Sequence, residues 1–300
     1  AILRSGGSVR YEGQKFKGGK PDDDSLHTPG WLASWVGVDY LDTVTEAYCG
    51  RAIVDADLVL VGGLSRLETL ALDRTAVTDA GLKHLEGLRG LRCLSMRRTA
   101  VTNQGLVHLK GMTDLQMLSL DETKVDGAGM EHFRGLAHLE SLRLDGTKVD
   151  DASLARLNGL TGLTALWLLD TAVTDAGLAH LKEMKKLTRL GLSKTAVTDA
   201  GLVNLTGMDK LADLYLAGTA VAGPGLVHLQ QLPALSRLSL SSTPVTDAGL
   251  AHLKGLTGLT SLILMNTAIT DAGLVNLRGM SSLTALLLSN TVVTDPGVDR

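Results

Sequence analysis

A threonine recurs every 24 residues along most of this chain, and no insertion or deletion interrupts the spacing. Each threonine ends a copy of the same phrase, and the first clean copy is residues 67–77. A fixed period of roughly 20–50 residues is typical of a solenoid, in which each unit buries its apolar side only against its neighbours. The threonines are Thr75, Thr99, Thr123, Thr147, Thr171, Thr195, Thr219, Thr243, Thr267 and Thr291.

The composition agrees with a leucine-filled repeat array. Hydrophobic residues make up 44% of the 300 residues but aromatic residues only 3%. The net charge is −3 and acids and bases are interspersed, so the sequence does not indicate binding to nucleic acid or to an anionic membrane. No run of about 18 apolar residues is present, so we expect no direct insertion of this chain into a membrane.

The two cysteines do not predict a disulfide or a compartment. Cys49 and Cys93 fall two repeats apart, and strands stacked roughly 4.8 Å apart would separate their backbones by about 10 Å. The chain begins at Ala1 and ends within a repeat at Arg300. We therefore expect a fragment or a processed product, with any signal or anchor upstream of residue 1.

One repeat predicts a short strand followed by a short helix. Leu70 and Leu72 alternate with polar or small residues, which predicts a strand with both leucines inward and positions 69, 71 and 73 outward. Position 79 holds Asp, Asn or Gly, and in two copies a proline follows it, Pro224 and Pro296. These residues predict a helix N-cap at Asp79 and a helix that ends near Gly87, with Leu82 facing the core.

The repeated phrase Leu-x-x-Leu-x-Leu-x-x-Thr-x-Val matches the leucine-rich-repeat signature, with Thr where Asn or Cys is usual. Its continuation, Thr-Asp-Ala-Gly-Leu, resembles the 24-residue repeats of bacterial leucine-rich-repeat proteins. It is also similar to the ribonuclease-inhibitor-like and cysteine-containing subtypes. The resemblance covers roughly residues 44–300. It implies an α/β solenoid, a curved horseshoe with a parallel β-sheet on the concave face and short helices on the convex face.

The resemblance and the period together suggest a domain division. We expect an N-terminal cap over residues 1–43 and a leucine-rich-repeat array over residues 44–300. Within the array, residues 44–66 form a divergent first repeat, residues 67–291 the regular repeats, and the remainder a truncated last repeat. In the cap we expect a strand near residues 8–11, a polar loop at 12–27 and a helix that carries Trp31 and Trp35 over the first repeat.

The repeated threonine has a predicted structural role. At the turn that leaves the strand, buried backbone groups lack a regular partner, and each costs about 1–3 kcal/mol if it stays unpaired. A threonine hydroxyl can supply that partner. We therefore expect Thr171→Val to destabilise the chain more than the same change at Thr174, which the sequence predicts to be exposed.

Histidines and aspartates that recur at fixed repeat positions have structural interpretations that outweigh metal binding. Arg156, Asn204 and Asn276 replace histidine in other copies, and Asn is a poor zinc ligand, so a repeated hydrogen bond is favoured. One aspartate per repeat gives too few oxygens for calcium, and helix capping would account for them. The histidines are His84, His108, His132, His180, His228 and His252; the aspartates are Asp175, Asp199, Asp247 and Asp271.

A catalytic site is not predicted, because every Ser, Thr, His and Asp of interest occupies a repeated structural position rather than a unique one. No glycine-rich loop of phosphate-binding form is present in the sequence. We therefore expect no enzymatic activity and no cofactor.

The concave face is where the repeats differ. Trp167 and Tyr215 stand two repeats apart, about 10 Å, with Gly191 between them, which predicts a notch walled by aromatic rings. Trp, Tyr and Arg dominate binding hot spots. Chance drift at exposed positions is the alternative explanation. The predicted ligand-binding residues are Arg143, Trp167, Arg189, Gly191, Asp213, Tyr215 and Arg237.

Ile263, Met265 and Leu287 form a predicted apolar patch, a candidate interface with further chain or a second subunit. The main functional hypothesis is a protein-recognition module that binds a protein partner through the concave face. The alternative is a structural subunit or spacer that self-associates through its C-terminal end, and a third hypothesis is an accessory domain of a longer enzyme. The resemblance favours the cell envelope or an extracytoplasmic location.

Overall fold

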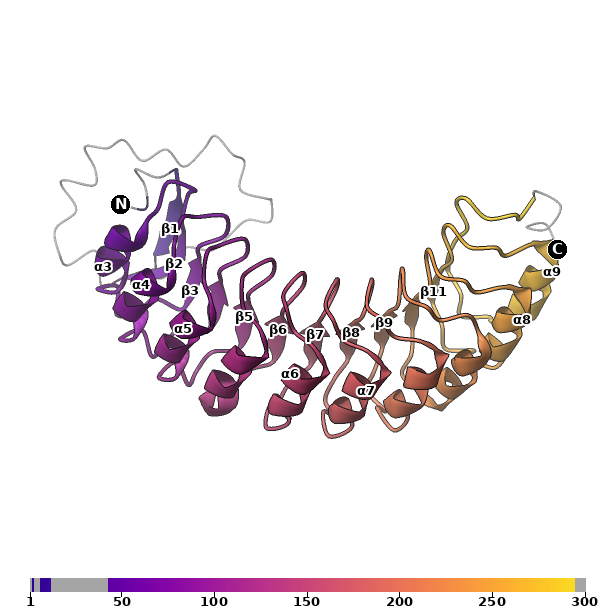
Figure 1. Cartoon of the computed structure of the whole chain (residues 1–300). Coiled ribbons are helices and arrows are strands. Elements are labelled where there is room, and N and C mark those ends of the chain that lie inside the picture. Colours follow the sequence, from indigo (N-terminus) through magenta and orange to yellow (C-terminus); the bar gives the residue numbers. More distant parts are fainter. Residues whose placement is uncertain (1, 3–5, 12–42, 295–300) are drawn as a thin grey trace. The chain divides into compact units, whose positions relative to one another are not determined.

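The computed structural model describes residues 2, 6–11 and 43–294 (Figure 1). The predicted polar loop at 12–27 and the helix predicted to carry Trp31 and Trp35 lie outside the described residues. The chain divides into two compact units, residues 1–142 and 143–300, and each is described by itself.

The first unit begins with an antiparallel strand pair and continues with parallel strands in chain order. The strand predicted near residues 8–11 is confirmed as β1, and it pairs antiparallel with β2. One or two short helical segments follow each of strands β2 to β5. The strands are β1 (Ser8–Tyr11), β2 (Val44–Tyr48), β3 (Thr69–Ala71), β4 (Cys93–Ser95) and β5 (Met117–Ser119); β6 (Ser141–Arg143) spans the division. The helices are η2 (Asp55–Asp57), α3 (Leu58–Val61), α4 (Asp79–Leu82), η3 (Lys83–Leu85), α5 (Asn103–Leu106), η4 (Val107–Leu109) and η5 (Gly127–Gly135).

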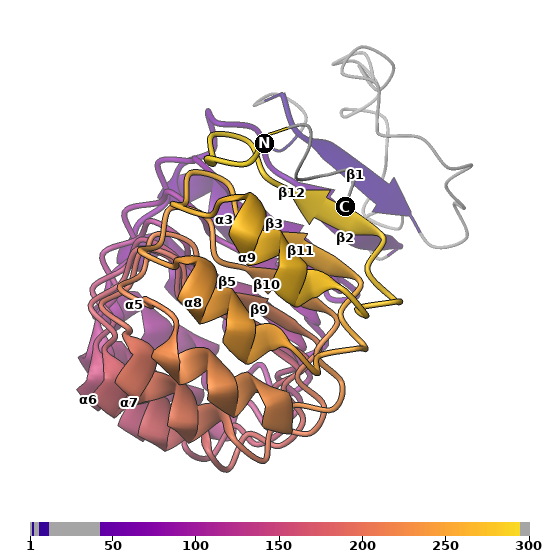
Figure 2. The same cartoon turned by 90° about the vertical axis from the view of Figure 1, so that its right-hand side faces the viewer.

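The second unit repeats the same strand–helix element with every strand pair parallel. Figure 2 shows strands β9 to β12 in one layer and helices α8 and α9 in another. Its strands are β7 (Ala165–Trp167), β8 (Arg189–Gly191), β9 (Asp213–Tyr215), β10 (Arg237–Ser239), β11 (Ser261–Ile263) and β12 (Ala285–Leu287). Its helices are α6 (Asp151–Arg156), α7 (Asp175–Leu178), η6 (Ala179–Leu181), η7 (Asp199–Leu205), η8 (Pro224–Gln231), α8 (Asp247–Leu250), η9 (Ala251–Leu253), α9 (Asp271–Leu274) and η10 (Val275–Leu277).

The core lies between strands and helices and is built from the repeated leucines. Leu70 and Leu72 are buried, as the alternation predicted, and Val77, Leu82 and Leu85 close the same repeat from the helix side. Corresponding leucines of successive strands are in register, for example Leu190 and Leu214. Because the helices are far shorter than the roughly 12–15 residues needed for independent stability, this stacking must hold them.

The predicted role of the repeated threonine is confirmed. In all ten copies its hydroxyl donates to the carbonyl oxygen three residues earlier, at 2.6–2.8 Å; Thr171 donates to Leu168 at 2.7 Å. The residue before the threonine has a positive φ, as at Lys194 (54°) and Gly218 (69°). The threonine hydroxyl therefore closes a tight turn by binding a carbonyl group that, in six of the ten copies, also accepts from the amide of the same threonine at 3.2–3.3 Å.

The predicted helix N-cap at Asp79 is wrong by one residue. The cap is Thr78, whose side chain accepts a hydrogen bond from the amide of Ala80, and α4 begins at Asp79. The predicted register rests on the Pro224 and Pro296 copies. In the Pro224 copy it holds, because there Gly223 is the cap and Pro224 the first helical residue; Pro296 lies outside the described residues. A register taken from the proline copies therefore places the helix start one residue too late in α4.

The aspartates that were assigned to capping instead connect one repeat to the next. The carboxylate of Asp175 accepts from the amide of Thr198 at 2.8 Å and from its hydroxyl at 2.6 Å. We call this pair of hydrogen bonds the aspartate bracket. It recurs at Asp55, Asp79, Asp151, Asp247 and Asp271; Asp199, which faces Ala222 rather than a threonine, accepts from three backbone amides.

The bracket explains the whole Thr-Asp-Ala-Gly-Leu motif. The threonine caps its own helix, and its hydroxyl donates to the aspartate of the preceding repeat. The aspartate accepts from the threonine of the following repeat, and the leucine is buried in the core. The glycine leaves room, because a Cβ at Gly201 would overlap Oδ1 of Asp175. Thr174 is accordingly half-buried and bonded to Asp151, so the prediction that it is exposed is wrong.

Candidate functional site

The candidate site lies on the sheet surface of the second unit that points away from the helices. We call it the sheet face; it consists of the outward side chains of strands β6 to β12 that belong to this unit. Its central row is Arg143, Trp167, Gly191, Tyr215, Ser239, Ile263 and Leu287. A second row, two residues earlier on each strand, contains Arg189, Asp213 and Arg237. All seven predicted ligand-binding residues therefore lie on this face.

Trp167 and Tyr215 are in contact with each other. Their ring centroids are 5.4 Å apart and their planes are inclined by 33°. Gly191 lies between them in register, and a Cβ built there would stand only 2.6 Å from Cε3 of Trp167. The rings close over the glycine, so the open notch with walls about 10 Å apart, expected from strand spacing, is not formed.

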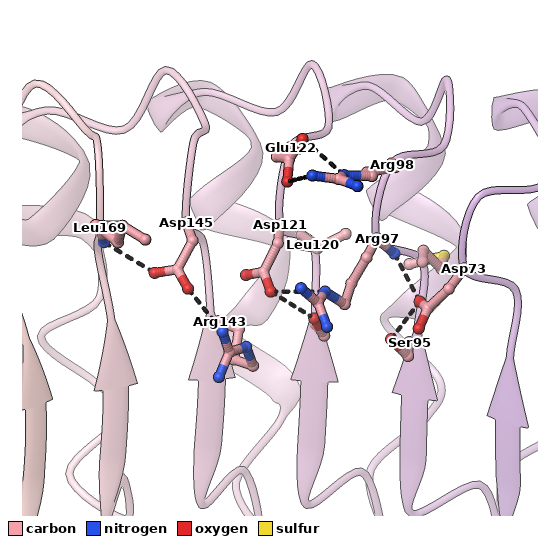
Figure 3. Close-up of polar contacts among 12 residues, drawn as sticks. Asp73, Ser95, Arg97, Arg98, Leu120, Asp121, Glu122, Arg143, Asp145 and Leu169 are labelled. Carbon is pink, nitrogen blue, oxygen red and sulfur yellow. Dashed lines mark hydrogen bonds and ion pairs between the residues drawn. The ribbon is translucent and has the colours of Figure 1, made fainter.

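Arg143 extends this stack on the other side of Trp167. Its guanidinium carbon lies 5.2 Å from the centroid of the Trp167 ring, within the distance of a cation–π interaction. Its Nη2 donates to Oδ2 of Asp145 at 2.7 Å, and Asp145 also accepts from the amide of Leu169 at 2.8 Å (Figure 3). The position of Arg143 is thus fixed from two directions.

Asp213 and Arg237 form a bidentate ion pair across neighbouring strands. Nε of Arg237 donates to Oδ1 at 2.6 Å, and Nη2 donates to Oδ2. The Asp213 residue is buried, with 2% of its surface exposed. The hydrogen bond and charge of Asp213 raise the pKa of Arg237 above its ordinary value. Both oxygens of this carboxylate therefore accept from the same guanidinium.

Arg189 is the remaining charged residue of the predicted site. It is exposed and lies beside Asp213 in register, but Asp213 pairs with Arg237 instead. Within the part of the chain that the structure describes, the Arg189 side chain makes no hydrogen bond or ion pair. The structure thus places six predicted residues in two groups, the aromatic stack with Gly191 and the Asp213–Arg237 pair, and Arg189 belongs to neither.

The predicted apolar patch is found near the last strand. Ile263 and Met265 are half-buried, and Leu287 is 40% exposed. The neighbouring Leu286, which corresponds to buried leucines in other repeats, is also exposed. Ile263, Met265 and Leu287 lie on the same sheet face as the aromatic stack, whereas Leu286 belongs to the inward row and is in register with the buried Leu262.

Sequence reasoning missed a polar row along the turns that follow the strands. In the first unit, Arg97 contacts the buried carboxylate of Asp121 at 3.0 Å, and Arg98 binds Glu122 at 2.6 Å (Figure 3). Asp73 accepts from the amide of Arg97 at 2.9 Å. The sequence contains a signal for this polar row, because Asp recurs at position 73 of the phrase. That its carboxylate connects neighbouring repeats becomes visible only when the strands are stacked.

The recurrent histidine position serves different partners in different copies. Asn204 and Asn276, which replace histidine, donate to backbone carbonyls of Asp175 and Asp247, as a repeated hydrogen bond predicts. His108 instead contacts Glu86 at 2.5 Å, and Nδ1 of His132 is buried without a hydrogen-bonding partner in the described part of the structure. Among the described residues, no three His, Cys, Asp or Glu side chains are grouped so that they could hold a metal ion.

The two cysteines are both free, as their separation predicted. Burial raises the pKa of the Cys49 thiol to about 12. Burial also raises the pKa of the Cys93 thiol on β4. In the described part of the chain, no helix is both long enough and apolar enough to span a bilayer.

Comparisons with known proteins identify the fold. No known family model matches the chain, and no curated protein matches its sequence. An internalin, InlF, from Listeria monocytogenes is similar in structure, with 21% identity, a TM-score of 0.62, and coverage of 86% of this chain and 84% of that one. Internalin C2 from the same organism has 23% identity, a TM-score of 0.53, and coverage of 79% and 84%.

A plant structure is also similar: the peptide hormone receptor RGFR1 in complex with RGF2. The identity is 17% and the TM-score 0.50, over 78% of this chain and 42% of that one. Together these likenesses confirm the leucine-rich-repeat fold that the repeated phrase predicted. The ribonuclease-inhibitor-like and cysteine-containing subtypes stay predictions.

Proposed function

We propose that this chain is a non-enzymatic protein-recognition module that binds a partner protein through the sheet face of its second unit, the predicted concave face. The observation that carries the proposal is the stack of Arg143, Trp167 and Tyr215 over Gly191. Each of these three residue types is enriched in binding hot spots. None of the three contributes to the leucine core, so packing of the fold does not by itself account for them.

The stack is held in place before any partner arrives. Arg143 is fixed by Asp145 and by the Trp167 ring, and Trp167 is fixed by Tyr215. Immobilising a flexible side chain on binding costs about 0.5–1.5 kcal/mol, and a preformed surface avoids most of that cost. The fixed positions of these side chains favour a recognition surface over residues that accumulated by chance at exposed positions.

The structural neighbours support a recognition role only by analogy. The RGFR1 structure contains a peptide hormone receptor in complex with RGF2, and two further neighbours are internalins. At 17–23% identity these likenesses concern the fold. For this chain, the absence of enzymatic activity and of a cofactor, the domain division at residue 43, and an envelope or extracytoplasmic location stay predictions.

The second candidate function is assembly with another subunit through the end of the second unit. Leu286 and Leu287 expose 37% and 40% of their surface, and the half-buried Ile263 and Met265 adjoin them. Exposed apolar surface of this kind marks interfaces. Light scattering separates the two candidates, because assembly predicts a mass that rises with concentration, whereas a recognition module predicts a constant monomer mass.

Site-specific photocrosslinking tests the proposed face. A photoreactive amino acid is placed at Ser193, on the sheet face two residues after β8, or at Ala179, on the helix side at the start of η6. After irradiation in extract of the source cells, adducts are identified by mass spectrometry. The proposal predicts a specific protein adduct at Ser193 and none at Ala179. Adducts confined to Ala179, or equal at both positions, would contradict it.

A further inference from the structure

Arg189 is a cation without a counter-charge on an otherwise balanced surface. Arg143 pairs with Asp145 and Arg237 pairs with Asp213, so the charges of those four residues cancel. Arg189 is exposed, and its guanidinium has no ionic or hydrogen-bonding partner among the described residues. The aromatic stack and its two ion pairs therefore carry one net positive charge, located on β8.

Asp213 pairs with Arg237 and not with Arg189. The guanidinium of Arg237 donates to both carboxylate oxygens of Asp213, and the Asp213 side chain is only 3% exposed. Arg189 lies on the other side of Asp213, on the neighbouring strand. Among the described residues, therefore, no carboxylate pairs with Arg189, and its guanidinium is open to the carboxylate of a bound molecule.

The chain around Arg189 adds positive charge rather than negative. Residues 182–189 contain Lys182, Lys185, Lys186 and Arg189 but one acid, Glu183. Lys185 donates to the carbonyl of Gly207 at 3.2 Å, and Lys186 is exposed. Residues 182–189 therefore carry a net positive charge, whereas the whole chain has a net charge of −3.

Arg189 also lies next to the aromatic stack. It is two residues before Gly191 on the same strand, and side chains two apart point to the same face. Its register partners Ala165 and Asp213 are two residues before Trp167 and Tyr215. A side chain that binds the arginine would therefore place its neighbours in sequence against the two rings.

We propose that Arg189 binds the carboxylate of an aspartate or glutamate side chain of the partner protein, while an apolar residue beside that acid packs on Trp167 and Tyr215. The inference rests on the proposed function and specifies the chemistry of the partner. A guanidinium fits a carboxylate in a bidentate arrangement, as Arg237 and Asp213 already show on the same face.

A phage-displayed library of random dodecapeptides is the first probe. It is panned against the wild-type chain, Arg189→Gln, and the control Arg278→Gln, which removes an exposed arginine at the end of η10. The double variant Trp167→Ala/Tyr215→Ala is included to test the face itself. Thermal melting verifies that all variants are folded, which we expect because Arg189 and Arg278 are exposed.

The expected result is enrichment of Asp and Glu next to apolar residues on wild type and on Arg278→Gln. The acidic excess, but not all binding, should vanish on Arg189→Gln. Enrichment without an acidic excess, or an excess that persists in Arg189→Gln, overturns the assignment of Arg189 and leaves the proposed function standing. Failure to enrich any peptide that depends on Trp167 and Tyr215 contradicts the proposed function as well.

A matched peptide pair then tests the contact directly. An enriched peptide and its Glu→Gln or Asp→Asn counterpart are titrated calorimetrically against wild type and Arg189→Gln. Neutralising the peptide should weaken binding to wild type by about tenfold or more, and binding to Arg189→Gln by less than about twofold. Equal losses on both proteins would show that the acid binds elsewhere and would overturn the proposal.

Discussion

The rings of Trp167 and Tyr215 touch across an intervening strand, with centroids 5.4 Å apart. Strand β8 separates their strands, and adjacent strands are about 4.8 Å apart, so direct contact requires both side chains to lean inward. Gly191 makes that possible, because it is the residue on β8 that has no side chain to fill the space between them. The glycine thus turns two separate aromatic residues into one rigid surface.

Gly191→Ala should separate the rings. The new Cβ would stand 2.6 Å from Cε3 of Trp167, so the indole has to move, and overpacking of this kind costs about 1–3 kcal/mol. We expect a changed near-ultraviolet circular dichroism spectrum and a lower midpoint of urea unfolding. Gly159→Ala is the control, because nothing lies within 4 Å of a Cβ at that position. Identical spectra for the two variants would show that the rings do not depend on Gly191.

Asp175→Ala should strongly destabilise the second unit. It removes the aspartate bracket to Thr198, two hydrogen bonds to a charged acceptor, and leaves the Thr198 amide without this partner. We expect a loss of about 2–4 kcal/mol in the free energy of unfolding, measured by urea titration. The control Asp209→Ala removes an exposed aspartate and should cost less than about 0.5 kcal/mol. A similarly small loss of unfolding free energy in both variants would show that the aspartate bracket contributes no more than a surface contact.

Thr171→Val should cost about 1–2 kcal/mol, because it deletes the hydroxyl that donates to Leu168 at 2.7 Å inside the turn. Thr174 is not a suitable control, since its hydroxyl donates to Asp151 and caps α7. Thr257 is exposed, and the same β-branched replacement there should leave the unfolding midpoint nearly unchanged. Equal shifts of the unfolding midpoint for the variants at Thr171 and Thr257 would contradict the structural role of the repeated threonine.

Cys49 should resist alkylation. The thiolate is the reactive form, and burial raises the pKa of this thiol to about 12, so little thiolate is present at pH 8. We expect its reaction with iodoacetamide, followed by mass spectrometry, to be roughly a thousandfold slower than that of an unperturbed thiol with a pKa of about 8.5. The rate should still be rising at pH 10, because the thiolate forms only as the pH approaches the raised pKa. A plateau below pH 9 would contradict the shift.

The fold could be predicted from the sequence because each repeat carries the same information ten times. Alternation around Leu70 and Leu72 predicted the strand, and spacing predicted the stack. The helix start was misplaced, because Asp79 and Thr78 are both good cap residues and the choice depends on where the next repeat lies. Asp79 binds Thr102 of the next repeat, and this contact cannot be recognised within a single repeat.

The site was predictable as a location but not as a geometry. The identities of Trp167, Tyr215 and Arg143 indicated a recognition surface, whereas strand spacing alone predicted an open notch. Side-chain inclination over Gly191 closed it. Likewise, Asp213 lies between two arginines on neighbouring strands, and only side-chain geometry showed that Arg237 takes it and Arg189 does not.

The central claim is that the sheet face of the second unit binds a protein through its aromatic stack. The most direct test is the dissociation constant of the photocrosslinked partner for Trp167→Ala/Tyr215→Ala and for the matched control Val203→Ala/Val227→Ala. The control removes two exposed apolar side chains from η7 and η8 on the helix side. The account predicts that the first pair weakens binding by about a hundredfold or more and the control by less than about twofold. Unchanged affinity in the first pair, or equal losses in both, would contradict it.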